Sequence, residues 1–97
     1  MNDVLENIDL STVLVRRGDL IAQELEGELV MLDMRSGHYF GLDPIASAIW
    51  SRLDKPITLQ ALCDSLTADY AVPFEQCLSD VSSFLDELLE KDLVERL

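Results

Sequence analysis

Hydrophobic and polar positions divide the chain into strand-like runs in its first half and helical runs in its second. The clearest strand is "ELVMLD", because the continuous apolar run over residues 29–32 is typical of a central strand covered on both faces. Extended segments are also predicted over residues 13–25 and in "HYFGL", residues 38–42. Turn residues separate these runs at Glu26-Gly27 and at Arg35-Ser36-Gly37. The pattern therefore predicts a three-stranded antiparallel meander.

Two helices are predicted directly after the strands. The first begins at Asp43-Pro44, an N-cap carboxylate followed by a first-turn proline, and ends at Lys55-Pro56. Its apolar face comprises Ile45, Ile49 and Leu53. Thr58 is expected to cap the second helix, whose apolar residues recur at helical spacing as far as Tyr70.

The longest helix is predicted from Pro73 to about Lys91. At 100° per residue its apolar side chains span an arc of roughly 140°, which is wide for a helix that covers a sheet on one side only. These apolar residues are Phe74, Cys77, Leu78, Val81, Phe84, Leu85, Leu88 and Leu89. Asp80 and Glu87 border the arc on the side of Cys77 and Phe84, and Glu75 and Ser82 border it on the other side. The tail "DLVERL" is expected to add a brief extended segment.

This order of elements predicts an α+β fold, a three-stranded antiparallel β-meander followed by three α-helices. It resembles a winged helix-turn-helix with the strands placed first. With 97 residues, the chain is long enough for one small core. We expect a flexible N-terminal arm over residues 1–12 and a single domain over residues 13–97.

Charge and composition narrow the classes of partner. Nineteen acidic residues against seven basic ones give a formal net charge of −12, which repels nucleic acid and anionic membranes. The start "MNDVLENIDL" lacks the order of a signal peptide, and no apolar run is long enough to span a membrane. Cys63 and Cys77 have no metal-ligand spacing, so we expect reduced thiols in the core of a cytoplasmic protein.

Candidate catalytic chemistry is weak. His38 is the single histidine, and no nucleophile and acid accompany it in a catalytic pattern. Asp33, Asp43 and His38 are the best candidates for a metal site at one end of the sheet, but solvated charge explains them better. We therefore expect no enzyme activity, no metal and no cofactor.

The aromatic strand over residues 38–42 remains to be explained. It would lie at the edge of the meander with unpaired backbone groups, and it has no proline or lysine to discourage pairing. Alternation places His38, Phe40 and Leu42 on one face and Tyr39 on the other. Two interpretations follow from the residues alone: the aromatics fill and flank the core, or they form the edge onto which an incoming peptide adds as a strand.

Residues 27–94 resemble the PqqD-like family, small recognition elements that bind leader peptides of ribosomally made natural products. The first matching feature is a hairpin with Leu32-Asp33 and "GHYFGLD", residues 37–43. It is followed by "IWSRLD" at residues 49–54 and by a long helix with Asp80-Val81, Phe84-Leu85 and Leu88. Asp43 replaces the usual asparagine, and Lys55-Pro56 stands where the family often has a glycine. The sequences "LDMRSGHYF" and "YAVPFEQ" are more similar to the leader-binding partner of a lasso-peptide leader protease than to the pyrroloquinoline-quinone D protein.

The resemblance implies that a precursor leader peptide pairs with the third strand and lies in a cleft beside the third helix. The expected peptide-binding residues are His38, Tyr39, Phe40, Gly41 and Leu42 with Cys77, Asp80, Val81, Phe84, Glu87 and Leu88. It also implies a separate leader peptidase, a transglutaminase-like cysteine protease, and a cyclase as partners. The alternatives are a pyrroloquinoline-quinone-type peptide chaperone for a radical SAM enzyme and a winged-helix DNA-binding regulator.

Overall fold

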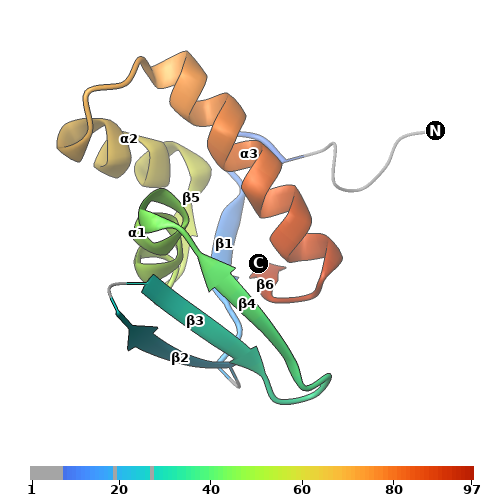
Figure 1. Cartoon of the computed structure of the whole chain (residues 1–97). Coiled ribbons are helices and arrows are strands. Elements are labelled where there is room, and N and C mark those ends of the chain that lie inside the picture. The colour runs from blue at the N-terminus through green and yellow to red at the C-terminus, as the bar shows by residue number, and fades with distance from the viewer. Residues whose placement is uncertain (1–7, 19, 27) are drawn as a thin grey trace.

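A computed structural model describes residues 8–18, 20–26 and 28–97. The predicted meander is confirmed. It consists of β2 (Leu20–Leu25), β3 (Glu28–Asp33) and β4 (His38–Leu42), paired antiparallel in the order β2-β3-β4. Two positive φ angles allow its tight connections, 53° at Glu26 after β2 and 75° at Gly37 before β4. Figure 1 shows β4 at the edge of this sheet.

A second sheet combines short strands that lie far apart in the sequence. β1 (Val13–Arg16) lies between β5 (Ile57–Thr58) and β6 (Val94–Arg96), antiparallel to both. The prediction of an extended tail is therefore confirmed by β6. The extended conformation predicted over residues 13–25 is found in β1 and β2, on either side of the charged segment that follows Arg16. Its placement in the meander is corrected, because β1 belongs to the second sheet and only β2 to the meander.

The three helices begin and end close to the predicted residues. They are α1 (Pro44–Arg52), α2 (Leu59–Asp69) and α3 (Phe74–Glu90). Asp43 caps α1 by accepting a hydrogen bond from Ala46 N–H at 2.8 Å, and Thr58 caps α2 by accepting one from Ala61 N–H at 3.1 Å. No helix in the described part of the chain combines the length and apolarity that crossing a membrane requires.

The core lies between the helices and the two sheets. α1 packs on β3 and β4, α2 on α3, and α3 on β6. The side chains with the least exposed area are Leu14, Met31, Leu53, Leu62, Cys63, Leu85 and Leu93. Val81 and Leu85, in the middle of the predicted apolar arc of α3, are both buried, whereas Ile45 of the predicted α1 face is 48% exposed. The arrangement leaves one flank of α3 facing β4 (Figure 1).

Residues 1–7 of the expected N-terminal arm lie outside the described residues. Residues 8–12 contact the domain, since Ile8 packs against the core. Gln60 N–H donates to Leu10 C=O and Leu59 N–H donates to Thr12 C=O, each at 3.0 Å. These bonds join the segment before β1 to the start of α2.

Candidate functional site

The aromatic strand β4 is an edge strand that pairs with β3 alone among the described strands. Phe40 faces the core, where it packs partly buried, and Leu42 beside it is 7% exposed. Tyr39 lies on the opposite face and is 74% exposed. The face that the sequence left open is thereby assigned: Phe40 points inward and Tyr39 points outward.

Strand register determines which backbone groups of β4 point away from the sheet. Leu25 and Glu28 face each other with two residues between them, and the pair that closes so short a connection exchanges both of its backbone hydrogen bonds. Bonding then alternates along β3, so Leu29, Met31 and Asp33 bond toward β4. Their partners are Leu42, Phe40 and His38. The backbone N–H and C=O groups of Tyr39 and Gly41 consequently point outward.

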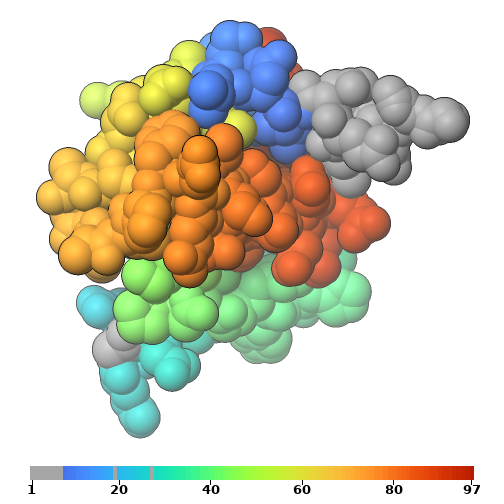
Figure 2. All heavy atoms as spheres, turned by 90° about the horizontal axis from the view of Figure 1, so that it is seen from above, coloured from blue at the N-terminus to red at the C-terminus, as the bar shows by residue number. Residues whose placement is uncertain are grey.

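A cleft of about 320 Å³ separates this edge from α3. Its walls are supplied by β4 on one side and by the last turns of α3 on the other. The lining residues are Met31, Tyr39, Phe40, Gly41, Leu42, Phe84, Glu87, Leu88, Lys91 and Leu93. In Figure 2 the green atoms of β4 and of the start of α1 lie along one flank of α3, and blue N-terminal atoms lie along the other.

Two further cavities lie along the same flank of α3. One, of about 530 Å³, lies at the β3–β4 turn and shares Phe40 and Lys91 with the cleft; we call the two together the β4–α3 groove. The other, of about 180 Å³, is an apolar pocket between α1, the end of α2 and the start of α3. It is lined by Ile45, Ile49, Leu66, Tyr70, Val72, Cys77, Asp80 and Val81.

All eleven expected peptide-binding residues line these three cavities. The β4 residues and the set Phe84, Glu87 and Leu88 line the groove, whereas Cys77, Asp80 and Val81 line the apolar pocket. Glu75 and Ser82, on the opposite flank of α3, line none of the three. The contribution of each residue to binding stays a prediction.

Sequence reasoning missed several lining residues. Met31 lies in β3 and Leu93 lies between α3 and β6, and no local sequence pattern indicates that either lines the groove. Lys91 was detectable, because at 100° per residue it falls between Asp80 and Phe84 on the same flank. The apolar pocket was also missed, since it forms where three helices meet.

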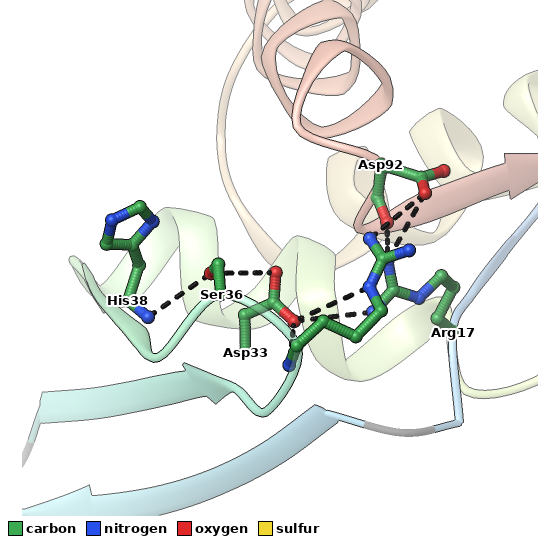
Figure 3. Close-up of polar contacts among 6 residues, drawn as sticks. Arg17, Asp33, Ser36, His38 and Asp92 are labelled. Atoms are coloured by element: carbon green, nitrogen blue, oxygen red, sulfur yellow. Dashed lines mark hydrogen bonds and ion pairs between the residues drawn. The ribbon is translucent and has the colours of Figure 1, made fainter.

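A network of charged side chains lies beneath the groove at the β3–β4 turn (Figure 3). Asp33 is 4% exposed, and its carboxylate accepts hydrogen bonds from Arg35 N–H at 3.0 Å and Ser36 Oγ at 3.2 Å. Arg17 Nη2 lies 3.5 Å from the same carboxylate. Burial alone would raise the pKa of Asp33, but these hydrogen bonds and the charges of Arg17 and Arg35 outweigh it and hold the pKa below its ordinary value.

The two cysteines are buried free thiols in α2 and α3. Burial, followed by the neighbouring Cys77 thiol, raises the pKa of Cys63 to about 12. A thiol with so high a pKa is protonated at neutral pH and is a poor nucleophile. Among the residues that the structure describes, no group of three or more His, Cys, Asp or Glu side chains is arranged to hold a metal ion.

The fold and the groove define a class: a small α+β domain in which an open sheet edge lies beside a long amphipathic helix. The family model for coenzyme PQQ synthesis protein D (PqqD) matches residues 28–94, and the chain belongs to this family. A search of curated proteins gave no match.

Two solved structures share the fold. One is titled "TbiB1 in Complex with the TbiA(beta) Leader Peptide"; it is 31% identical, with a TM-score of 0.75, and the match covers 84% of this chain and 94% of that one. The other is titled "Lasso peptide synthetase B1 complexed with the leader peptide"; it is 24% identical, with a TM-score of 0.74, and the match covers 84% and 96%. The likeness to the second concerns the fold alone.

Proposed function

We propose that this protein binds the leader segment of a ribosomally synthesised precursor peptide, of the lasso-peptide type. The leader adds as a strand to β4 and lies in the β4–α3 groove. The observation that carries the proposal is the placement of the outward backbone groups of Tyr39 and Gly41 beside a cleft whose other wall is α3. An extended peptide gains affinity from such backbone groups and specificity from pockets for its alternate side chains.

The structural relatives support the same function. TbiB1 is 31% identical and is described in complex with a leader peptide, and the match covers nearly all of that chain. Family membership by itself also supports the alternative, a peptide chaperone of the pyrroloquinoline-quinone type that serves a radical SAM enzyme. The complex of TbiB1 with a leader peptide, together with the resemblance of "LDMRSGHYF" and "YAVPFEQ" to lasso-type leader-binding proteins, favours the first.

The energy available fits a reversible adaptor. Two outward residues offer four hydrogen bonds at ~1 kcal/mol net each, and two apolar anchors add ~1.5–3 kcal/mol each, giving roughly 7–10 kcal/mol in total. Ordering a flexible leader takes back several kcal/mol. The remainder corresponds to about micromolar affinity at best, and a longer contact with the groove would be needed for tighter binding.

The proposed role is presentation and not catalysis. The protein would deliver the precursor, in the cytoplasm, to a separate transglutaminase-like leader peptidase and to a cyclase. The raised pKa of Cys63 supports this role, because a protonated thiol is a poor nucleophile.

The test is a titration of the labelled protein followed by backbone NMR shifts. The first probe is the TbiA(beta) leader peptide, and the second is any short precursor encoded beside this protein. We expect shifts at β4 and at Cys77, Asp80, Phe84 and Glu87, with Glu75 and Ser82 as internal controls that do not move. The peptide should be recovered at unchanged mass. Shifts centred on the Glu75 flank, or cleavage by the metal-free protein alone, would contradict the proposal.

A further inference from the structure

The end of the groove at the β3–β4 turn differs in chemistry from the rest. This part, about 530 Å³, is lined by Asp33, Arg35, Ser36, His38, Phe40 and Lys91. Phe40 is its single apolar side chain, and three of the others are basic. In a protein with a net charge of −12, this local excess of basic side chains has to be explained.

Four charges in this region balance one another. Arg35 Nη2 lies 3.0 Å from Asp92 Oδ2, and Arg35 Nε lies 3.9 Å from Asp33 Oδ1. Arg17 is also in ion-pair range of both carboxylates. Two arginines and two aspartates therefore form a network with no net charge, in which both carboxylates are paired with the arginines (Figure 3).

Lys91 and His38 stand outside that network. Lys91 follows the last turn of α3 and lines both parts of the groove. Glu87, four residues earlier, lies within the same cleft, yet no ion pair joins it to Lys91 among the described residues. The His38 backbone N–H donates to Ser36 Oγ at 3.2 Å, while its imidazole points away from the Asp33 network (Figure 3). This end of the groove thus carries a net positive charge. The side chains of Lys91 and His38 form no ion pair with a carboxylate of the described residues.

We propose that this end of the β4–α3 groove binds one acidic side chain, Asp or Glu, of the peptide that occupies the groove. The inference rests on the proposed function and adds a specificity determinant to it. The ammonium of Lys91 and the imidazole of His38 would donate to the carboxylate, and Arg35 provides a further positive charge behind them. Because the rest of the protein is strongly acidic, a carboxylate elsewhere on the peptide would be repelled.

An acidic side chain at this position would also fix the register of the added strand. A slip by one residue turns every side chain of a strand to its other face. The carboxylate would then point away from α3 and lose contact with Lys91. The expected ligand is therefore neutral or basic overall, with one acidic residue at a fixed distance from its apolar anchors.

A displayed library of random peptides tests this inference. The peptides are joined to the carrier through their C-termini, so that no free α-carboxylate is present, and are selected on the wild-type protein and on Lys91→Glu. We expect wild-type binders to carry Asp or Glu at one fixed position and Lys91→Glu binders to lose that preference. The matched control is Lys55→Glu, which changes the other lysine of the chain, an exposed residue that lines none of the groove.

Affinity measurements complete the test. A selected peptide, synthesised with a C-terminal amide, is compared with its Glu→Gln or Asp→Asn counterpart. Lys91→Glu should weaken binding of the acidic peptide about three- to tenfold and barely affect its amide counterpart, since the substitution removes one solvated ion pair and replaces it by a repulsion between like charges. Binders that perturb β4 but share no acidic position, or equal effects of Lys91→Glu and Lys55→Glu, would overturn this inference and leave the proposed function intact. Failure to recover any binder that perturbs β4 would overturn both.

Discussion

At the scale of single residues, neighbouring positions of α3 have different tasks. Leu85 is fully buried in the core, whereas Phe84 is half-buried and lines the groove. Leu85→Ala is expected to lower the free energy of unfolding by about 2–5 kcal/mol because it leaves a cavity. Phe84→Ala is expected to lower leader affinity by more than it lowers stability. Denaturant melts and peptide titrations measure the two effects.

Leu78 provides the matched control for Phe84. It is also half-buried on α3 but lies on the flank away from the groove. Leu78→Ala should lower stability to a similar degree and leave peptide affinity unchanged. Equal loss of affinity in both variants would show that Phe84 acts through the stability of the helix and does not contact the peptide.

Asp33 is expected to make stability depend on pH. The pKa of its carboxyl lies below the ordinary value of 3.8 in the folded protein, so its charged form is favoured by folding. Its contribution is therefore complete above about pH 5 and is lost as the pH falls through the folded pKa. Thermal melts from neutral to acidic pH should show this loss in the wild type and a weaker one in Asp33→Asn.

Asp33→Asn should also melt at a lower temperature at neutral pH, because Arg17 and Arg35 lose a shared carboxylate. Asp54→Asn is the control, since Asp54 is exposed and makes no hydrogen bond or ion pair within the described part of the chain. If the two variants have the same pH profile, the Asp33 network does not stabilise the fold.

At the scale of elements, the sequence predicted correctly those strands and helices that are determined by residues close together in the chain. Alternating and continuous apolar runs predicted the meander, and Asp43 and Thr58 identified the starts of two helices. The second sheet was not predictable in the same way. Its strands have four, two and three residues, and β1 pairs with segments more than forty and about eighty residues away. No periodicity appears in runs so short.

The candidate site was predictable to a similar extent. The aromatic edge strand and the flank of α3 that carries Cys77 and Phe84 follow from periodicity and family resemblance. The sequence did not predict which of Tyr39 and Phe40 points toward the core, because either face of an edge strand can pack against it. The basic end of the groove depends on Arg35 and Lys91 meeting across the fold, which sequence spacing does not reveal.

Strand addition to β4 predicts an alternation along that strand. Proline removes one backbone N–H, which is tolerated where that group points outward and destabilising where it bonds to a neighbouring strand. Tyr39→Pro and Gly41→Pro should therefore remain folded and lose peptide binding. Phe40→Pro should unfold or be strongly destabilised, since Phe40 bonds to Met31 of β3. Circular dichroism and peptide titration separate these outcomes.

Alanine variants at the same positions are the controls for lost side chains. Gly41→Ala meets no atom of the protein within 4 Å of its new Cβ, so it should fold, and because it keeps its backbone N–H it should bind the peptide more tightly than Gly41→Pro. Phe40→Ala should be less destabilised than Phe40→Pro. If Tyr39→Pro and Gly41→Pro both fold and bind with unchanged affinity, the peptide does not pair with β4.

At the scale of the whole molecule, the distribution of charge separates this protein from the winged-helix regulators that its element order resembles. α3 would be the recognition helix of such a protein, yet it carries Glu75, Asp80, Asp86, Glu87 and Glu90 and no basic residue. Most arginines are engaged with other groups: Arg16 lies over the Trp50 ring, Arg52 is paired with Asp69, and Arg17 and Arg35 belong to the Asp33 network.

Binding of duplex DNA is therefore expected to be absent at physiological salt. A DNA-binding helix gains most of its affinity by neutralising phosphates, and here the facing charges are of the same sign as the phosphates. An electrophoretic mobility assay with random-sequence duplex at micromolar protein should show no shifted band, while the same preparation still binds the leader peptide. The peptide titration serves as the control for an active, folded sample. A shifted band that disappears at high salt would show that the protein engages phosphates despite its net charge of −12, and the exclusion of a DNA-binding regulator would be wrong.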